Sequence, residues 1–168
     1  MNKMKYLSFS GQPEAQETLL AWWNSLQENH GDRAELRRCR NSTEVAFLPA
    51  YHRLRLSLGK IAPIKPDDLA IVAGVLSHVK TPDSSHRFSQ QMASHKKESD
   101  RSRVSGLRFR RLLTIDDPGE LYGSIIRIVR LLDGTANIPS LADGLYWWNE
   151  RTKKTWAFDY YSEAPEEK

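Results

Sequence analysis

The sequence lacks the features that mark secreted and membrane-spanning proteins. It contains a single cysteine, Cys39, so no disulfide can form within the chain. No apolar run approaches the roughly 20 residues that a membrane-spanning helix requires. The apolar part of the N-terminal segment is too short and too interrupted for a signal peptide. We therefore expect a cytoplasmic protein that has no membrane partner.

Signatures of catalysis and metal binding are also missing. Cys39 has no C-x-x-C partner, and the histidines form no H-x-x-x-H or H-E-x-x-H pattern. Glycine-rich phosphate loops, nucleophile elbows and dinucleotide-binding fingerprints are absent. The acidic pairs Asp67/Asp68 and Asp116/Asp117 stand where helix caps belong, which favours capping over paired-carboxylate nuclease chemistry. We therefore predict no catalytic residue, no metal site and no cofactor.

Positive charge is in moderate excess. Of the 168 residues, 25 are Lys or Arg and 21 are Asp or Glu, which gives a net charge of +4. Together with a pI near 9.2, this excess favours an acidic partner. Hydrophobic residues make up 39% of the chain, which is enough for a core in one compact domain or two small lobes.

Hydrophobic spacing is helical in nearly every segment of the first half. Apolar residues recur at i, i+3, i+4 and i+7 in a first helix that ends at His30-Gly31, namely Leu19, Trp22, Trp23 and Leu26. Asp32 is predicted to cap a second helix, with Glu35 as its capping-box partner. That helix should reach about Arg40, and Asn41-Ser42-Thr43 should break it.

The next segments contain a short helix, a loop and a central helix. Pro49 is predicted to open the short helix, which runs through Leu56 and precedes a loop over 59–66. Asp67 or Asp68 is expected to cap the following helix. Because this helix is apolar on several sides between Leu69 and Val79, we expect it at the centre of the fold.

Residues 81–102 are polar and poor in large apolar side chains. We interpret them as a mobile connection, whose pattern also allows a short helix near 87–94. This connection separates a predicted N-terminal bundle, 1–80, from a C-terminal bundle, 103–168. No segment alternates with a period of two for long enough to indicate a strand. The predicted fold class is therefore all-α, with two small helical bundles joined by a polar connection.

The C-terminal bundle is predicted to contain three helical segments. The first covers about 103–114, with Ser105, Phe109, Leu112 and Leu113 packed inward. The second follows Asp117 and Pro118, a cap and an N1 proline, and presents a seam of Leu121, Ile125, Ile128 and Leu132. The third starts at Ser140, with Asp143 completing a capping box, and turns inward Leu141, Leu145, Trp148 and Trp156.

Arginines form three clusters, and we predict that they bind nucleic acid. The first, on the second helix, has i, i+4, i+7 spacing: Arg33, Arg37 and Arg40. The second is Arg101, Arg103, Arg108, Arg110 and Arg111, of which Arg103 and Arg110 are expected to share one helix face. The third is Arg127 and Arg130.

Rows of arginine without interleaved acids favour an anion lying along them, because like charges at i, i+4 repel. The planar guanidinium also grips phosphate bidentately, which lysine does not. This pattern predicts contact with a nucleic acid backbone and says nothing of base sequence. A solvated surface with local acid partners, such as Glu35 or Asp116, remains the alternative.

Aromatic side chains are the second ingredient of single-strand binding, because bases stack on them. The tryptophans have core spacing, so we expect most of them to be structural. One of the pairs Trp22/Trp23 or Trp147/Trp148 must still point partly outward. Tyr51 and His52 are expected to close the first bundle. We therefore expect the protein to bind nucleic acid through charge more than through base stacking.

Several short motifs, taken in order, resemble the CasB-type small subunit of the type I-E CRISPR Cascade complex. They are Leu36-Arg37-Arg38, Leu48-Pro49-Ala50-Tyr51-His52-Arg53-Leu54, Arg103-Val104, Arg108-Phe109, Arg130-Leu131-Leu132 and Trp147-Trp148. Each motif alone is weak, but their order and spacing extend over most of the chain.

The resemblance implies an all-helical protein without enzymatic activity. It implies that the partners are other Cascade subunits, a second copy of the chain, guide RNA and target DNA, mainly the displaced single strand. It assigns the basic role to Arg38, Arg103, Arg108 and Arg130, and also to Lys65. Two other functions stay open: a protein-interaction module that docks acidic subunits without DNA contact, and a stand-alone nuclease.

Overall fold

Helices form nearly all of the regular structure in residues 6–164, the part of the chain that this computed structural model describes. The first half contains α1 (Pro13–Glu28), α2 (His30–Arg38), α3 (Ser42–Val45), α4 (Pro49–Gly59) and α5 (Pro66–Leu76). The second half contains α6 (Phe88–Ala93), α7 (Gly106–Leu113), α8 (Pro118–Leu131), α9 (Ile138–Tyr146) and α10 (Glu150–Glu163). The predicted all-α fold class is confirmed.

A minimal sheet joins the two halves. Strands β1 (Thr81–Pro82) and β2 (Thr135–Ala136) pair in parallel, with Thr81 opposite Thr135. Each strand has only two residues, which is too short for an alternating pattern to be recognised in the sequence. The pair fixes the end of α8 beside the chain that leaves α5.

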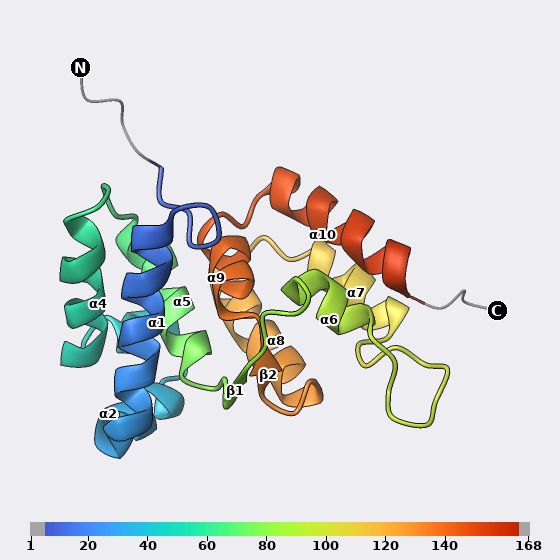
Figure 1. The fold of residues 1–168 in the computed structure, drawn as a ribbon, viewed down its shortest axis with the longest axis horizontal. Helices are drawn as coiled ribbons and strands as arrows, with labels where there is room; N and C mark the ends of the chain where they lie inside the picture. Colours follow the sequence, from blue (N-terminus) through green and yellow to red (C-terminus); the bar gives the residue numbers. More distant parts are fainter. Residues whose placement is uncertain (1–5, 165–168) are drawn as a thin grey trace.

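Helix α5 lies at the centre of the fold, as its apolar sequence predicts. Every residue from Leu69 to Leu76 is buried. The helix packs against α2, α3 and α4 and also against α8 and α9. Figure 1 places α1, α2 and α4 at one end of the molecule, α6, α7 and α10 at the other, and α8 and α9 between them.

Two predicted helix starts are confirmed. Pro49 stands in the first turn of α4, and Pro118 stands in the first turn of α8. The Asp117 carboxylate caps α8 by accepting a hydrogen bond from the Glu120 amide at 2.9 Å. The predicted seam of α8 is buried along its whole length, at Leu121, Ile125, Ile128 and Leu132. Both signals are local, so they do not depend on the rest of the fold.

Asparagine side chains begin four helices and correct several predicted caps. Each accepts a hydrogen bond from the amide three residues ahead: Asn29 for α2, Asn41 for α3, Asn137 for α9 and Asn149 for α10. The predicted caps at Asp32 and Ser140 are wrong, because both residues lie inside helices. His30-Gly31 opens α2, and the predicted third segment of the second bundle is two helices, with Asn149 between them.

Three further details of the predicted helices differ. Asp67 and Asp68 lie in the first turn of α5, whose N-cap position is Lys65. Helix α7 begins at Gly106 and is capped by the hydroxyl of Ser105, which is therefore exposed and not packed inward. Asn41-Ser42-Thr43 ends no helix but begins α3.

The segment 81–102 contains one ordered element. The short helix that its pattern allows is α6, and its Phe88, Met92 and Ala93 are buried. Arg87 anchors it to α10 through two hydrogen bonds to the Asp159 carboxylate, at 2.9 and 2.8 Å. After α6 the chain forms an exposed loop that begins at Ser94. The division into 1–80, 81–102 and 103–168 stays a prediction.

The residues just before α1 are hydrogen-bonded to α9, more than 130 residues later in the sequence. The carboxylate of Asp143 accepts hydrogen bonds from the amides of Phe9 and Ser10, at 2.6 and 2.9 Å. Asp143 therefore serves this contact and does not complete the predicted capping box. Within residues 6–164, none of the helices is long and apolar enough to cross a membrane.

Candidate nucleic-acid interface

The first arginine cluster lies on α2 and just beyond it. Arg37 and Arg38 are exposed in the last turn, and the buried Leu36 holds the helix against the core. Arg33 is partly buried, and its Nε donates a hydrogen bond to the Ser77 carbonyl at 3.4 Å. Burial and the charge of Arg37 lower the pKa of Arg33. Because α2 ends at Arg38, the exposed Arg40 lies outside the predicted helical row.

Arginines of two predicted clusters act on one buried histidine. His78, just after α5, is only 7% exposed, and its Nε2 has no hydrogen-bond partner among the described residues. Burial lowers the pKa of His78 to about 4, with further contributions from the charges of Arg37, Arg130 and Arg33. Arginines from α2 and from the end of α8 therefore lie within electrostatic reach of the same imidazole.

The end of α8 gathers two more arginines. Arg103 forms an ion pair with Asp133, with 3.4 Å between Nη1 and Oδ2, and the Asp133 amide donates to the Arg130 carbonyl. Arg127 lies one turn before Arg130, exposed, with its Nη2 donating to the Ser124 hydroxyl at 3.2 Å. We call Arg33, Arg37, Arg103, Arg127 and Arg130 the α8-end cluster.

The five arginines of the predicted second cluster lie in three separate places. Arg103 precedes α7, so the predicted helix face shared with Arg110 does not exist. Arg108, Arg110 and Arg111 are exposed on α7. Arg101 lies in the exposed loop after α6. The predicted second cluster is therefore divided among the α8-end cluster, a separate set on α7 and the loop after α6.

Lys65 is held by α9. Its Nζ donates to the Tyr146 carbonyl at 3.2 Å and lies 4.4 Å from the centre of the Trp147 ring. It also pairs with Asp68 at 3.2 Å, and its amide donates to the Tyr146 hydroxyl at 2.8 Å. These contacts give the side chain a role in joining α5 to α9.

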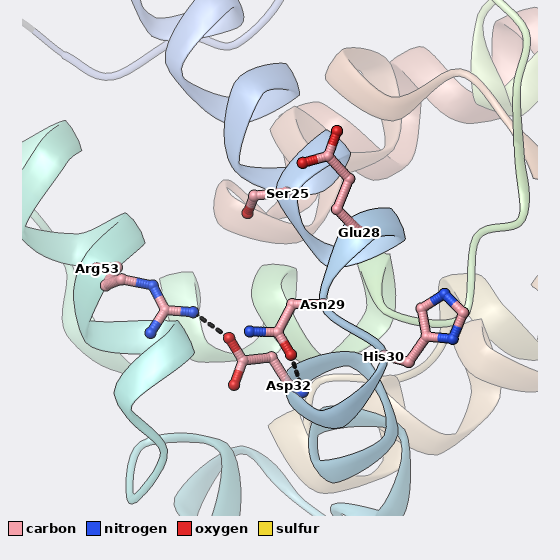
Figure 2. A pocket seen from close by; sticks show the side chains of 6 residues that line it. All are labelled: Ser25, Glu28, Asn29, His30, Asp32 and Arg53. Carbon is pink, nitrogen blue, oxygen red and sulfur yellow. Dashed lines mark hydrogen bonds and ion pairs between the residues drawn. The ribbon is translucent and has the colours of Figure 1, made fainter.

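The surface pocket at the junction of α1 and α2 shows no catalytic arrangement. Figure 2 shows the Arg53 guanidinium pointing at the Asp32 carboxylate, with which it forms an ion pair. The Asn29 side chain is occupied with the Asp32 amide, and His30 points away from this pair (Figure 2). In residues 6–164, no cluster of three or more His, Cys, Asp or Glu side chains could hold a metal ion.

Most tryptophans are structural, as their spacing predicts. Trp22, Trp23 and Trp156 are buried, and the indole N–H groups of the first two donate to the Ala50 and Leu76 carbonyls. Trp147 and Trp148 are the pair that is partly exposed. Sequence reasoning missed the exposed aromatic residues Phe158 and Tyr161 on α10, because it merged α9 and α10. The cap residue Asn149 was the signal that could have separated them.

Comparison with known proteins gives one family and one fold. The family model described as CRISPR-associated protein Cse2 matches residues 32–161. The fold is similar to a chain in the crystal structure of E. coli Cascade bound to a PAM-containing dsDNA target. That match has a TM-score of 0.69 and 20% sequence identity, and it covers 90% of this chain and 97% of that chain. Comparison with curated protein sequences gives no significant match.

The family match spans most of the chain and includes every arginine of the predicted clusters. It confirms the resemblance to the CasB-type small subunit. The protein belongs to the Cse2 family of CRISPR-associated proteins.

Proposed function

We propose that this protein is a non-catalytic subunit of a Cascade-type CRISPR complex that binds nucleic acid backbone without sequence specificity. In this role it stabilises the displaced DNA strand after the guide RNA has paired with its target. Its partners are the other subunits, a second copy of the chain, guide RNA and target DNA. Family membership and the fold shared with a chain of DNA-bound Cascade support the proposal.

The observation that carries the proposal is that Arg33, Arg37 and Arg130 all lie within electrostatic range of one side chain, His78. These arginines come from helices that are far apart in the sequence. Burial, and to a lesser extent their charges, keep the imidazole neutral at physiological pH. A phosphate group placed at such a cluster is favoured, because it offsets the mutual repulsion and accepts charge-assisted hydrogen bonds.

Weak binding of the displaced strand is enough for this function. Exchange of a DNA duplex for a guide–target hybrid is nearly balanced in free energy. Even a few phosphate contacts on the displaced strand therefore shift the equilibrium toward the open state. Contacts to the backbone alone suit a complex whose target changes with each guide.

The α8-end cluster can be tested with the double variant Arg37→Gln/Arg130→Gln in the reconstituted complex. We expect weaker binding of target duplex and a shallower dependence of affinity on salt. For a single strand, each phosphate that is no longer neutralised lowers the slope of log K against log salt by about 0.7. A matched control, Lys60→Gln/Lys96→Gln, removes the same charge from exposed positions at the end of α4 and in the loop after α6 and should leave both quantities close to wild type.

Other results would contradict the proposal. If Arg37→Gln/Arg130→Gln lowers the yield of assembled complex, but the complex that does form binds DNA with unchanged affinity and salt slope, the cluster docks acidic subunits. Failure of the isolated wild-type chain to bind DNA at low salt would favour the same alternative. Cleavage of single- or double-stranded DNA by the purified chain with Mg²⁺ would overturn the non-catalytic assignment.

A further inference from the structure

Helix α10 exposes two aromatic side chains on its outer face. Phe158 is 66% exposed and Tyr161 is 50% exposed, whereas Trp156 and Tyr160 on the inner face are buried. The exposed pair is separated by three residues, so the rings lie about one turn apart. Large apolar side chains that remain in water at neighbouring positions indicate a surface that meets a partner.

Cations share this outer face. Arg151 and Lys154 are exposed and precede Phe158 by seven and four residues, which places all three on one side of the helix. Asp159 is turned away, because its carboxylate is bound to Arg87 of the α6 cap. Glu150, in the first turn of α10, precedes Lys154 by four residues and so adds one negative charge at the start of this face. The row therefore changes from positive charge to aromatic surface along the helix.

The aromatic end of the row borders the arginines of α7. The Phe109 ring stacks on Tyr160 at 4.0 Å between centroids and meets the Tyr161 ring edge-on at 5.8 Å. Phe109 is flanked in the sequence by Arg108 and Arg110, both exposed. Tyr161 thus lies beside a helix that carries part of the basic surface.

We propose that Arg151, Lys154, Phe158 and Tyr161 form a binding site for single-stranded nucleic acid, in which bases stack on the two rings. The choice of nucleic acid as ligand rests on the proposed function and on the positive charge that shares the face with the rings. An apolar partner helix would have to bury the charges of Arg151 and Lys154, whereas a phosphate backbone pairs with them.

The geometry of the helix suits consecutive nucleotides. Three residues of α-helix rise about 4.5 Å, so the two rings lie close enough to meet neighbouring, unstacked bases of one strand. Each ring can therefore receive one of two neighbouring bases. Stacking tolerates any base, because every base has a π face, so this site would keep the complex independent of target sequence.

The test compares two oligonucleotides that differ only in their bases. Oligo(dT) and an abasic oligonucleotide of equal length are titrated onto the isolated chain and onto the reconstituted complex. Phe158→Ala and Tyr161→Ala should each weaken oligo(dT) binding roughly tenfold, with the abasic affinity and the salt slope unchanged. Phe158→Trp should retain the affinity. Leu56→Ala, which truncates an exposed apolar residue of α4, should have no effect on either oligonucleotide.

Three outcomes would overturn the stacking site. They are unchanged oligo(dT) affinity in the ring variants, equal losses for both oligonucleotides, and loss of complex assembly with oligo(dT) binding intact. The last would make the face a docking surface for another subunit. A different result would contradict the proposed function itself: the wild-type chain and complex would then bind neither oligonucleotide. If only Arg37→Gln/Arg130→Gln alters affinity and salt slope, the proposed function stands without the stacking site.

Discussion

At the scale of single residues, His78 couples stability to pH. Its pKa is about 4 in the folded protein because of burial and nearby arginines, whereas an unfolded histidine has a pKa of about 6.5. Between these values the unfolded chain binds a proton that the folded chain does not. Folded stability is therefore present above pH 6.5 and is lost as the pH falls through this window, by at most about 3 kcal/mol.

Replacement of His78 by glutamine should remove this contribution. The wild type should lose more free energy of unfolding than His78→Gln when urea denaturation is carried out at pH 5 instead of pH 7. The glutamine keeps a polar side chain near the Arg33, Arg37 and Arg130 charges but has no proton to bind in this range. Equal losses in the two proteins would show that other groups govern the acid sensitivity.

Some residue roles follow from local chemistry and others do not. Trp22 and Trp23 could be assigned to the core from their spacing alone, because the helical period fixes which face they occupy. Lys65 could not be assigned, because its partners Tyr146 and Trp147 follow it at a long distance along the chain. The assignment of Lys65 to nucleic acid contact stays a prediction.

At the scale of elements, the contact between α9 and α10 depends on the absence of a side chain. A Cβ atom at Gly144 of α9 would overlap the ring of Trp156 on α10. Trp156 is buried and packs edge-on against Trp148 and at a tilt against Phe88, so it has little freedom to move aside. The helix pair therefore requires glycine at this position.

Gly144→Ala should destabilise the protein by about 1–3 kcal/mol, as overpacking does in cores. Alanine favours a helix by up to about 1 kcal/mol over glycine, so any observed loss understates the strain. Gly59→Ala is a suitable control, because the nearest side-chain atom to its added Cβ would be Ile64 Cγ1 at 4.0 Å. Unfolding in urea measures both, and equal stabilities of the two variants would contradict the packing argument.

Helix boundaries show how far local signals reach. Pro49 and Pro118 could be placed from the sequence, because proline suits the first turn of a helix whatever surrounds it. Asn29 cannot be told from Asp32 by local chemistry, because both can cap a helix, and Asn149 lies inside what the hydrophobic spacing predicts as one helix. Asp143 shows why the choice is not local, since its carboxylate is taken by the Phe9 and Ser10 amides.

At the scale of the whole molecule, the candidate site depends on tertiary structure. The arginine clusters could be found in the sequence, because their spacing is visible there. Their convergence could not, since it needs α2 and α8 to pack on α5 so that Arg37 and Arg130 both reach His78. The stacking face of α10 was hidden for a similar reason, because the exposure of Phe158 is set by which side of the helix meets α6.

The same packing predicts that the two ends of the molecule unfold together. Helix α5 packs against α9, the Lys65 amide is bound by the Tyr146 hydroxyl, and the Trp147 indole donates to the Leu7 carbonyl at 2.7 Å. Two lobes that share a buried helix cannot lose one without exposing the apolar surface of the other. We therefore expect a single cooperative transition in spite of the polar segment between them.

Site-specific probes can test this cooperativity in urea. Fluorescence of a Trp147→Phe/Trp148→Phe/Trp156→Phe variant reports on Trp22 and Trp23 of α1, and that of a Trp22→Phe/Trp23→Phe variant reports on the tryptophans of the second half. Within each variant, the fluorescence midpoint should coincide with the midpoint from far-UV circular dichroism, because the helices melt together. Separate midpoints would instead show lobes of independent stability. Coincidence would mean that a substitution at the α8-end cluster and one on α10 act on one cooperative unit, so the stability cost of each can be read from the same transition.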